Sequence, residues 1–559
     1  MKGQSSATIP FIFPFLLLFS STVYCLTPFC ASIDPPIKDI PDLKYIPIPL
    51  PKHSQQILND FLECLAVKFQ STNHPIMEAI YTPQNTSFHQ VLLAHTKNRR
   101  YTTLDTPKPL AIVAAKHERH VQATVICAKQ HGLQIRIRSG GHDYEGLSYV
   151  SDVPFVILDM FNLRSIDVNV TEGRVWVQSG ATIGELYYEV GKKSRVHGFA
   201  AGSCPSVGIG GHFSGGGYGP LLRKYGLTVD NIEDARLVNV NGEILDRMSM
   251  GEDLFWAIRG GGGASFGVII SWKIKLLPVP AQVTVFQVER TLEQGAKDVV
   301  HRWQYVAPNL PEDLFIRTAI KTKNGSQEGT KAAVAIFSCQ FLGRADKLLQ
   351  LMNESFPELG LQQKDCFEMS WEESMIFLAG CPVGTPLEVL LSRPKLPVIF
   401  FKSKSDYVKK PIPKHGWKSL WKNLITIDHL LVQLNPYGGR MSEISESGTP
   451  FPHRAGNLFS VQYFISWKEE EIETIKRNIH MSRKLYKSMA PYVSQNPREA
   501  LQNYRDLDIG ANLHNRTNFR TARRYGSKYF KGNFDRLVRV KTMVDPHNFF
   551  HHEQSIPPL

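Results

Sequence analysis

The chain has 559 residues, which is too many for one hydrophobic core, so we expect two or three domains. Its 42% hydrophobic and 21% charged residues are typical of a folded globular protein. The formal charge of +13 does not indicate a nucleic-acid partner, because the lysines and arginines are scattered and no basic run alternates with aromatic residues.

The N-terminus has the pattern of a secretory signal. Lys2 is followed by the apolar run IPFIFPFLLLF and then by small residues up to Ser32. The run is too short to span a bilayer, and no later segment is better suited. We therefore predict a signal peptide over 1–32 and a soluble protein exported to the apoplast or vacuole, without stable membrane insertion. Five N-x-S/T sequons fit this route, at Asn85, Asn169, Asn324, Asn353 and Asn515.

The eight cysteines indicate disulfide chemistry rather than a metal site. In an oxidising compartment Cys64 and Cys127 can pair and close a long loop, which would stabilise the fold by about 3–5 kcal/mol. No CxxC motif or Cys/His cluster has the spacing of a zinc site, so we predict no metal. Cys204 is unusual because it lies in a glycine-rich turn and not on an apolar face.

From about 105 to 280 strands and helices alternate. Strands are predicted for LQIRIR (133–138), PFVILDM (154–160), GRVWVQSG (173–180) and FGVIISWKIKLL (266–277), and helices for 117–131, 182–193 and 253–259. Asn241-Gly242 predicts a hairpin turn. The pattern indicates one α/β domain or two small domains packed together.

After PVPAQ (278–282) long strands dominate. They are TVFQVER, LFIRTAIK, AAVAIFSCQF, PVIFFKSKSDYV, HLLVQLN and LFSVQYFISW, interrupted by helices such as RADKLLQLMNESF. Strands of this kind with helices on one face predict an α+β domain built on an antiparallel sheet. The tail from about 496 is again loop and helix.

Three glycine-rich stretches are candidates for binding a phosphate-bearing cofactor. They are RSGGHDYEG (138–146), GSCPSVGIGGHFSGGGYG (202–219) and RGGGGASFG (259–267). Glycines clustered after strands let backbone N–H groups approach a phosphate, whereas a single glycine pair more often marks only a tight turn. Neither the P-loop pattern nor a βαβ unit placing a Rossmann motif is present, so the cofactor is bound in another way. His142 and Cys204, one in each of two stretches, are candidate covalent tethers.

The chain resembles plant berberine bridge enzyme-like flavoproteins of the vanillyl-alcohol oxidase and p-cresol methylhydroxylase superfamily. The motifs that carry the resemblance are SGGHDYEG, CPSVGIGGHFSGGGYG, RKYGLTVDN, SMGEDLFWAIRGGGGASFG, NPYGG, PFPHRAGN, NYRDLD and DPHNFF…EQSIPPL, in order from about residue 60 to the C-terminus.

The resemblance implies an α+β fold with a two-part FAD-binding domain and a substrate domain whose antiparallel sheet is covered by helices. It places the FAD-binding domain at 33–283, the substrate domain at 284–495 and a C-terminal segment returning to the first domain at 496–559.

In that family FAD is attached through two side chains, which correspond here to His142 and Cys204. Two tethers fix the flavin ring and should raise its reduction potential, which favours hydride uptake from poor donors. The further residues expected at the cofactor are Arg138, Ser139, Gly140, Gly141, Val207, Gly208, Gly211, His212, Asn503 and Tyr504.

The resemblance also suggests how the flavin is reoxidised. The residue three after the cysteine gates oxygen in this family, and valine there resembles oxidases whereas leucine resembles dehydrogenases. Val207 therefore favours an oxidase that releases hydrogen peroxide, although simple packing would also explain a valine. His212 matches a histidine that can steady negative charge on the reduced flavin.

The substrate side departs from the family pattern. In FSVQYFISW the period of two places Ser460 and Gln462 on one face, which suggests a cavity wall, with a solvent-exposed face as the alternative. Gln462 matches a position where some members have a glutamate base, and glutamine cannot abstract a proton. Ser460 replaces a lysine found near two tyrosines in alcohol-oxidising members, so the cationic partner is missing there. Those tyrosines match Tyr144 and Tyr218.

Tyr504 in NYRDLD is the leading candidate for an acid/base residue. A tyrosinate is reachable only if its pKa falls well below about 10, and a buried structural phenol is the alternative. Gln502 replaces a further tyrosine common before NYRD. Arg440, after NPYGG, is a candidate substrate contact or else a solvated turn residue.

The primary hypothesis is a secreted, monomeric FAD-linked oxidase of plant specialised metabolism. Its substrate would be a phenolic, terpenophenolic or alkaloid-type molecule, with O2 as the second substrate and oxidative cyclisation as one outcome; the altered tyrosines make carbohydrate a weaker candidate. A second hypothesis is a flavin-containing non-redox cyclase that orients diene and dienophile in a Diels–Alder reaction. A third is a non-catalytic flavoprotein.

Overall fold

The computed structural model describes residues 50–68, 74–324, 331–393, 399–512 and 517–559. The predicted signal segment, 1–32, and the sequon at Asn515 lie outside these residues. The other four sequon asparagines, Asn85, Asn169, Asn324 and Asn353, are exposed. Among the described helices, none combines the length and the apolar character needed to cross a membrane.

Two small sheets build the first half of the chain. The first has the order β1-β2-β4-β3, with β2, β4 and β3 parallel and β1 antiparallel to β2. The second is antiparallel and has the order β5-β6-β10-β8-β9. Their strands are β1 (Ile80–Tyr81), β2 (Ala111–Ala114), β3 (Gln134–Arg138), β4 (Phe155–Asp159), β5 (Ile166–Asn169), β6 (Arg174–Gln178), β8 (Ile232–Val238), β9 (Ile244–Leu245) and β10 (Val268–Lys275), and a separate pair joins β7 (His197–Gly198) to β11 (Leu277–Pro278).

The predicted strands and the β8–β9 hairpin of this half are confirmed. The strands form two separate sheets, and the division of this half into one domain or two stays a prediction. The helices are α1 (Lys52–Lys68), α2 (Phe88–Ala94), α3 (Glu118–Gln130), α4 (Ile183–Lys193), α5 (Ile209–Ser214), α6 (Leu222–Tyr225) and α7 (Arg247–Ile258).

Helix α7 begins six residues before the predicted start at 253, and its local capping explains the difference. The Asp246 side chain accepts a hydrogen bond from the Ser249 N–H, which starts a helical turn early. Gly251, with a φ of 72°, then interrupts the helix before the predicted part begins. Only the second, apolar part carries the periodicity that a sequence pattern detects.

A disulfide joins Cys64 of α1 to Cys127 of α3, which confirms the predicted pairing. Both cysteines belong to the same hydrophobic core cluster as Leu58, Phe61 and Val125. The bond links α1 to α3, and α3 in turn packs against β3 and β4 of the first sheet.

A single large antiparallel sheet forms the second half, with the order β15-β12-β14-β13-β17-β18-β16. Its strands are β12 (Val283–Thr291), β13 (Leu314–Asn324), β14 (Lys331–Phe341), β15 (Cys366–Met369), β16 (Phe400–Val408), β17 (Leu430–Pro436) and β18 (Phe459–Trp467). The predicted α+β architecture is confirmed. The change from the second sheet to the large one falls between Lys275 and Val283, while the exact domain boundaries stay predictions.

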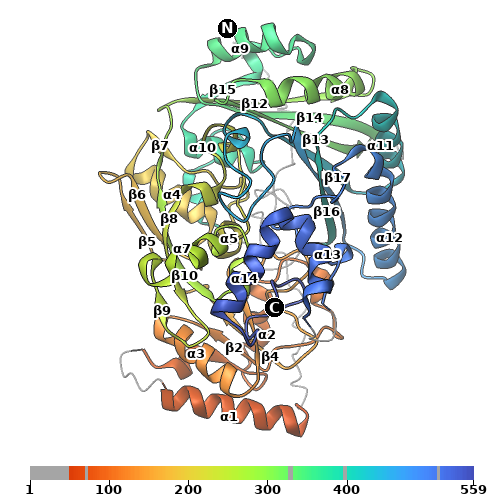
Figure 1. The fold of residues 1–559 in the computed structure, drawn as a ribbon. Coiled ribbons are helices and arrows are strands. Elements are labelled where there is room, and N and C mark those ends of the chain that lie inside the picture. The colour runs from red at the N-terminus through yellow and green to blue at the C-terminus, as the bar shows by residue number, and fades with distance from the viewer. Residues whose placement is uncertain (1–49, 69–73, 325–330, 394–398, 513–516) are drawn as a thin grey trace, which may run out of the picture.

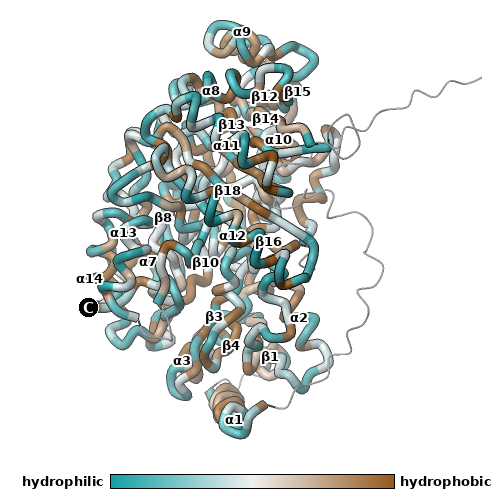
Figure 2. The backbone as a smooth tube through the Cα atoms, turned by 90° about the vertical axis from the view of Figure 1, so that its right-hand side faces the viewer, coloured by the Kyte–Doolittle hydropathy of each residue, from teal (hydrophilic) through white to brown (hydrophobic). Residues whose placement is uncertain are grey.

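Helices cover one face and the end of the large sheet (Figure 1). Helices α11 and α12 lie along its outer face, and α8 and α9 lie at its far end, as the view in Figure 2 also shows. These helices are α8 (Ala296–Val306), α9 (Ala345–Ser355), α11 (Lys414–Thr426) and α12 (Ile472–Met489). Helix α10 (Trp371–Leu378) packs instead against α4 and β7 of the first half. The opposite face is left for the first half of the chain.

The C-terminal segment returns to the first half, as expected. Helix α14 (Phe534–Val544) packs on α7, and α13 (Phe519–Phe530) packs on α14 (Figure 1). The fully buried Lys541 ammonium donates to the Ser265 and Phe550 carbonyls, at 2.7 Å each, and pairs with Asp545. Because an unpaired buried ammonium is costly, this lysine holds the tail in place.

Candidate active site

Two of the glycine-rich stretches meet backbone to backbone. A Cβ atom at Gly140 would overlap the backbone of Gly208, and one at Gly208 would overlap Gly140 in turn. Gly141 has a φ of +69°, and a Cβ there would overlap the His95 carbonyl. Only glycine fits at these positions. The loop that contains HDYEG (142–146) and the loop that contains CPSVG (204–208) are therefore held in direct contact.

The contact brings the two predicted tether residues to the same place. The Ser206 hydroxyl lies 3.2 Å from His142 Nε2 and 3.7 Å from the Cys204 sulfur, so it stands between them. Burial and the Lys97 ammonium lower the pKa of His142 to about 3, which keeps its imidazole neutral. A neutral imidazole nitrogen is the form that can bond to a flavin.

Cys204 lies on the cavity wall with His142, and its sulfur is 3.7 Å from the Ser206 hydroxyl. The attachment of a flavin at Cys204 stays a proposal.

Most of the predicted cofactor and substrate residues line one cavity. It lies between the glycine loops, the large sheet and the NYRD segment (503–506). The predicted residues on its wall are Ser139, Gly140, Gly141, His142, Tyr144, Cys204, Val207, Gly208, Gly211, His212, Tyr218, Gln462, Asn503 and Tyr504.

Asn503 fixes the NYRD segment to the glycine loop. Its amide nitrogen donates to the carbonyls of Gly211 and His212, at 3.2 Å each, and its oxygen accepts from Gly217 N–H at 3.1 Å. This position next to Tyr504 sets where that phenol enters the cavity.

Two predicted residues lie elsewhere. Arg138 is fully buried and is bound to Asp159, at 2.7 Å, and to two carbonyls of α2, so its charge is already satisfied away from the cavity. Arg136 is the arginine that borders the cavity, paired with Glu553. Arg440 is exposed and pairs with Glu443 at 2.7 Å, which is the solvated turn residue named as the alternative.

Gln462 is the member of the strand β18 pair that reaches the cavity. Its amide donates to the Tyr144 hydroxyl at 3.1 Å and to the Ser403 hydroxyl at 3.2 Å. Ser460 is buried in register with Asn435 and is not on the described cavity wall. The predicted cavity face is thus present, with glutamine as its contact residue.

Three phenols meet on the cavity wall. The rings of Tyr144 and Tyr504 are stacked, with centroids 5.4 Å apart and 11° between their planes. Tyr218 lies edge-on to Tyr504, and their hydroxyls form a hydrogen bond. These residues come from three separate segments of the chain.

A buried guanidinium that sequence reasoning missed lies beside them. Arg317, on β13, lines the cavity, and its Nε donates to Asn435 at 2.6 Å. Asn435 donates in turn to the Tyr218 hydroxyl at 3.2 Å. The available signals were single polar residues in the apolar strands LFIRTAIK and HLLVQLN, where Gln433 also lines the cavity.

The environment of Tyr504 opposes its ionisation. Burial, together with Tyr218 and Tyr144, raises its pKa well above the ordinary value, and only the Arg317 charge acts in the other direction. Burial also raises the pKa of Tyr144. The resting site therefore presents neutral phenols, which donate hydrogen bonds.

His212 is also neutral at rest. Its Nε2 accepts a hydrogen bond from the Gly202 N–H at 3.1 Å, and burial lowers its pKa from 6.5 to about 4. Nδ1 then carries the proton and is the atom able to donate toward a cofactor.

The neutral His212 predicts an acid-sensitive fold. Below pH 6.5 the unfolded chain binds a proton at this residue that the folded chain refuses, so stability falls from pH 6.5 down to about 4. The loss has an upper limit of about 3 kcal/mol, since one edge of the ring faces the cavity. Urea unfolding of the protein and of His212→Gln at pH 7, 6, 5 and 4 should show the variant losing less stability on acidification. Parallel pH curves would contradict the assignment.

The residues present fit an FAD. Glycine backbone lines the cavity at Gly140, Gly208 and Gly262, and Gly211 has open space where a Cβ would be. A pyrophosphate and a flat ring need backbone-lined space of this kind, with N–H groups pointing inward. The neutral His142 and the phenols of Tyr144 and Tyr504 border the same space.

Two family models match segments of the chain that line the cavity. Residues 109–247 match the FAD binding domain model, and residues 500–557 match the model of berberine and berberine-like proteins. The chain is 57% identical over 502 residues to berberine bridge enzyme-like 7 of Arabidopsis thaliana, which covers 89% of this chain and 94% of that protein.

Solved structures of relatives share the whole fold. The berberine bridge enzyme-like protein 28 of Arabidopsis thaliana superposes with a TM-score of 0.84 at 46% identity, covering 90% of this chain and 100% of that one. The grass pollen allergen Phl p 4, a glucose dehydrogenase, superposes with a TM-score of 0.84 at 42% identity, covering 89% and 99%. An isoleucine-to-valine variant of Phl p 4 is a glucose oxidase.

Proposed function

The chain belongs to the berberine bridge enzyme-like family of FAD-linked oxidoreductases, and from that premise we propose that it is an exported, monomeric oxidase of specialised metabolism. It would oxidise a phenolic, terpenophenolic or alkaloid-type substrate, with O2 as the electron acceptor and hydrogen peroxide as a product. Ring closure of the oxidised substrate is one outcome. We further propose that FAD is attached at His142 and at Cys204.

The observation that carries the proposal is the shared cavity. His142 and Val207 line the same cavity as three phenols, those of Tyr144, Tyr218 and Tyr504. When bound, FAD would accept a hydride from the substrate and pass the electrons to O2. The three phenols would bind and orient the substrate.

Tyr504 would take the substrate proton at its hydroxyl oxygen, which is hydrogen-bonded to Tyr218. Because burial makes the resting phenol neutral, Tyr504 first has to release its own proton to solvent through the hydrogen-bonded Tyr218 hydroxyl, which also lines the cavity. Asn435 donates to Tyr218 and therefore only steadies that hydroxyl. The Arg317 charge beside Asn435 would stabilise the phenolate that remains. In this scheme the base forms when Tyr504 loses its proton, and it is not present as a tyrosinate in the resting site.

The cavity wall suits an oxygenated substrate. Gln433, Gln462 and Arg317 supply hydrogen-bond donors, and the stacked Tyr144 and Tyr504 supply an aromatic surface. Glucose activity of the relative Phl p 4 puts sugars into the substrate panel as well.

One observation favours the non-redox cyclase as second candidate. The neutral Tyr504 is a hydrogen-bond donor, and a donor aimed at a carbonyl is what a cycloaddition catalyst requires. In that case FAD would support the fold without changing its redox state.

Anaerobic mixing separates these candidates. The holoprotein is mixed with a panel of phenols, terpenophenols, alkaloids and sugars in the absence of O2. An oxidase loses its flavin absorbance with at least one substrate, and peroxide appears when air is admitted. Product formation without bleaching would favour the cyclase, and the absence of both bleaching and product across the panel would favour a non-catalytic flavoprotein.

Replacing Val207 by leucine tests the oxidase assignment. Val207 is partly buried on the cavity wall, and its backbone is held by Ile183 and Cys204, so a larger side chain must extend into the cavity. We expect Val207→Leu to slow reoxidation of the reduced protein by O2 at least tenfold, with anaerobic reduction changed less than threefold. Stopped-flow absorbance measures both rates. The isoleucine-to-valine result in Phl p 4 supports this direction. Equal slowing of both rates would mean that leucine disturbs the site as a whole.

A further inference from the structure

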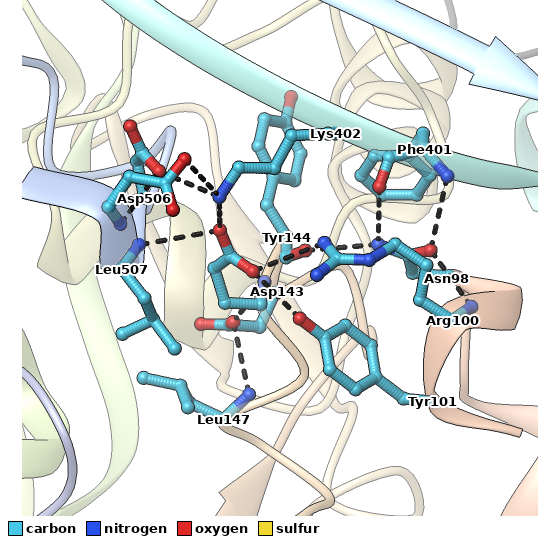
Figure 3. Close-up of polar contacts among 12 residues, drawn as sticks. Asn98, Arg100, Tyr101, Asp143, Tyr144, Leu147, Phe401, Lys402, Asp506 and Leu507 are labelled. Carbon is cyan, nitrogen blue, oxygen red and sulfur yellow. Dashed lines mark hydrogen bonds and ion pairs between the residues drawn. The ribbon is translucent and has the colours of Figure 1, made fainter. Parts of the chain in front are cut away.

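A cluster of buried charges lies directly behind the phenols and has no part in the chemistry described above. Lys402 and Lys404 of β16 are 3% and 1% exposed, and Glu145 and Asp506 are 4% and 2% exposed. Charged side chains of these types are rarely so buried unless they are paired. Figure 3 shows the Lys402 ammonium next to Asp506, with Tyr144 nearby.

Lys402 contacts two loops at the same time. Its ammonium binds Glu145, which follows Tyr144 in the HDYEG loop, and Asp506, two residues after Tyr504, at 2.7 Å (Figure 3). The Leu507 N–H also donates to Glu145 at 3.3 Å. One side chain on the edge strand of the large sheet therefore links the segments that carry the two stacked phenols.

The remaining partners of Glu145 fix its orientation. Tyr101 donates its hydroxyl to Glu145 at 2.7 Å, and Arg100 donates at 3.2 Å. Asn98 donates to the Tyr144 and Phe401 carbonyls, at 3.0 and 3.1 Å, which ties the backbone of the loop to β16 itself. The loop is thus held to β16 in two ways, by the Lys402–Glu145 ion pair and by the Asn98 hydrogen bonds (Figure 3).

We propose that Lys402 is a positioning residue, which keeps Tyr144 and Tyr504 stacked by binding Glu145 and Asp506 together. Removing the ammonium leaves two buried carboxylates on neighbouring loops without the cation between them, so the loops move apart or admit water. The consequence for substrate turnover rests on the proposed function, whereas the consequence for the two loops does not.

Lys404 provides a matched control. It lies two residues along the same strand, is equally buried, and binds Asp506 and Asp508 at 2.7 Å each. The structure gives it no contact to Glu145. Lys404→Met therefore removes a buried ammonium from the same carboxylate without breaking the link to the Tyr144 loop.

Hydrogen–deuterium exchange of the holoprotein without substrate tests the proposal. In Lys402→Met we expect amide exchange to rise at least tenfold in both segments, 142–147 and 503–508. In Lys404→Met we expect that rise only in 503–508, and in Lys402→Arg neither segment should change more than threefold.

If Lys402→Met does not fold, Glu145→Gln tests the same link, since glutamine keeps the Tyr101 contact. This variant should raise exchange in 142–147 alone. The proposal would be overturned if 142–147 exchanged at the wild-type rate in Lys402→Met, or if the two methionine variants showed identical patterns.

A kinetic arm uses any substrate that bleaches the wild-type flavin. At saturating substrate the rate of anaerobic reduction should fall at least tenfold in Lys402→Met, with recovery in Lys402→Arg. In Lys404→Met, where only the segment that carries Tyr504 is loosened, the fall should be at least threefold smaller than in Lys402→Met. Equal rates in the two methionine variants would also overturn the positioning role. If no substrate bleaches the wild type, the proposed function fails, and the exchange experiment still decides about Lys402.

Discussion

Replacing Tyr504 by phenylalanine should slow anaerobic flavin reduction by about 10²–10⁴-fold, with a much smaller change in substrate affinity. The phenylalanine keeps the stacked ring against Tyr144, so the binding surface stays, while the hydroxyl that bonds to Tyr218 is lost. Stopped-flow absorbance of the flavin over a range of substrate concentrations measures the rate and the dissociation constant separately.

Tyr437→Phe is the control for this experiment. Tyr437 is another fully buried phenol, hydrogen-bonded to Tyr407 at 3.3 Å, and it is not on the described cavity wall. Its loss should leave the reduction rate within about twofold of the wild-type value. If Tyr504→Phe reduced the flavin as fast as this control, Tyr504 would be a binding residue only, and the cyclase candidate would gain support.

Removing both proposed tethers should free the flavin from the protein and lower its reduction potential. In wild-type protein, and in His142→Ala and Cys204→Ala alone, acid precipitation should leave the yellow colour in the pellet, because one bond remains. In the double variant the colour should move to the supernatant. Each fall of 30 mV in the potential shifts the flavin–substrate equilibrium about tenfold for a two-electron couple. Equilibration with redox dyes measures the potential.

The single variants separate the two proposed bonds. If Cys204 holds no flavin, His142→Ala alone releases all the colour, and peptide mapping finds no flavin on the peptide that contains Cys204. That outcome would reduce the proposed attachment to one bond. Ser206→Ala, next to both side chains, should leave the colour in the pellet, since it removes no bond to the flavin.

The sequence determined the features that depend on neighbours along the chain. Alternating residues predicted the strands of the large sheet, and apolar periodicity predicted α3 and α4. The glycine stretches predicted backbone that can approach a cofactor phosphate, and this contact stays a prediction. The structure shows glycine backbone on the cavity wall and two loops in contact at Gly140 and Gly208. Motifs such as SGGHDYEG identified the family because they are fixed local patterns. The start of α7 was missed, since its first turn depends on a cap and carries no apolar pattern.

Only the tertiary structure decided which side chains share the cavity. A period of two gives the face of a strand but not the neighbouring strand, so Arg317 and Asn435 became visible only once β13 and β17 paired. The same limit hid the link from Lys402 to Glu145, which are 257 residues apart. The direction of the Tyr504 pKa shift was equally hidden, because it depends on burial and on phenols from two other segments. Residue type and local spacing set the available chemistry, and long-range packing sets the charges and distances under which it operates.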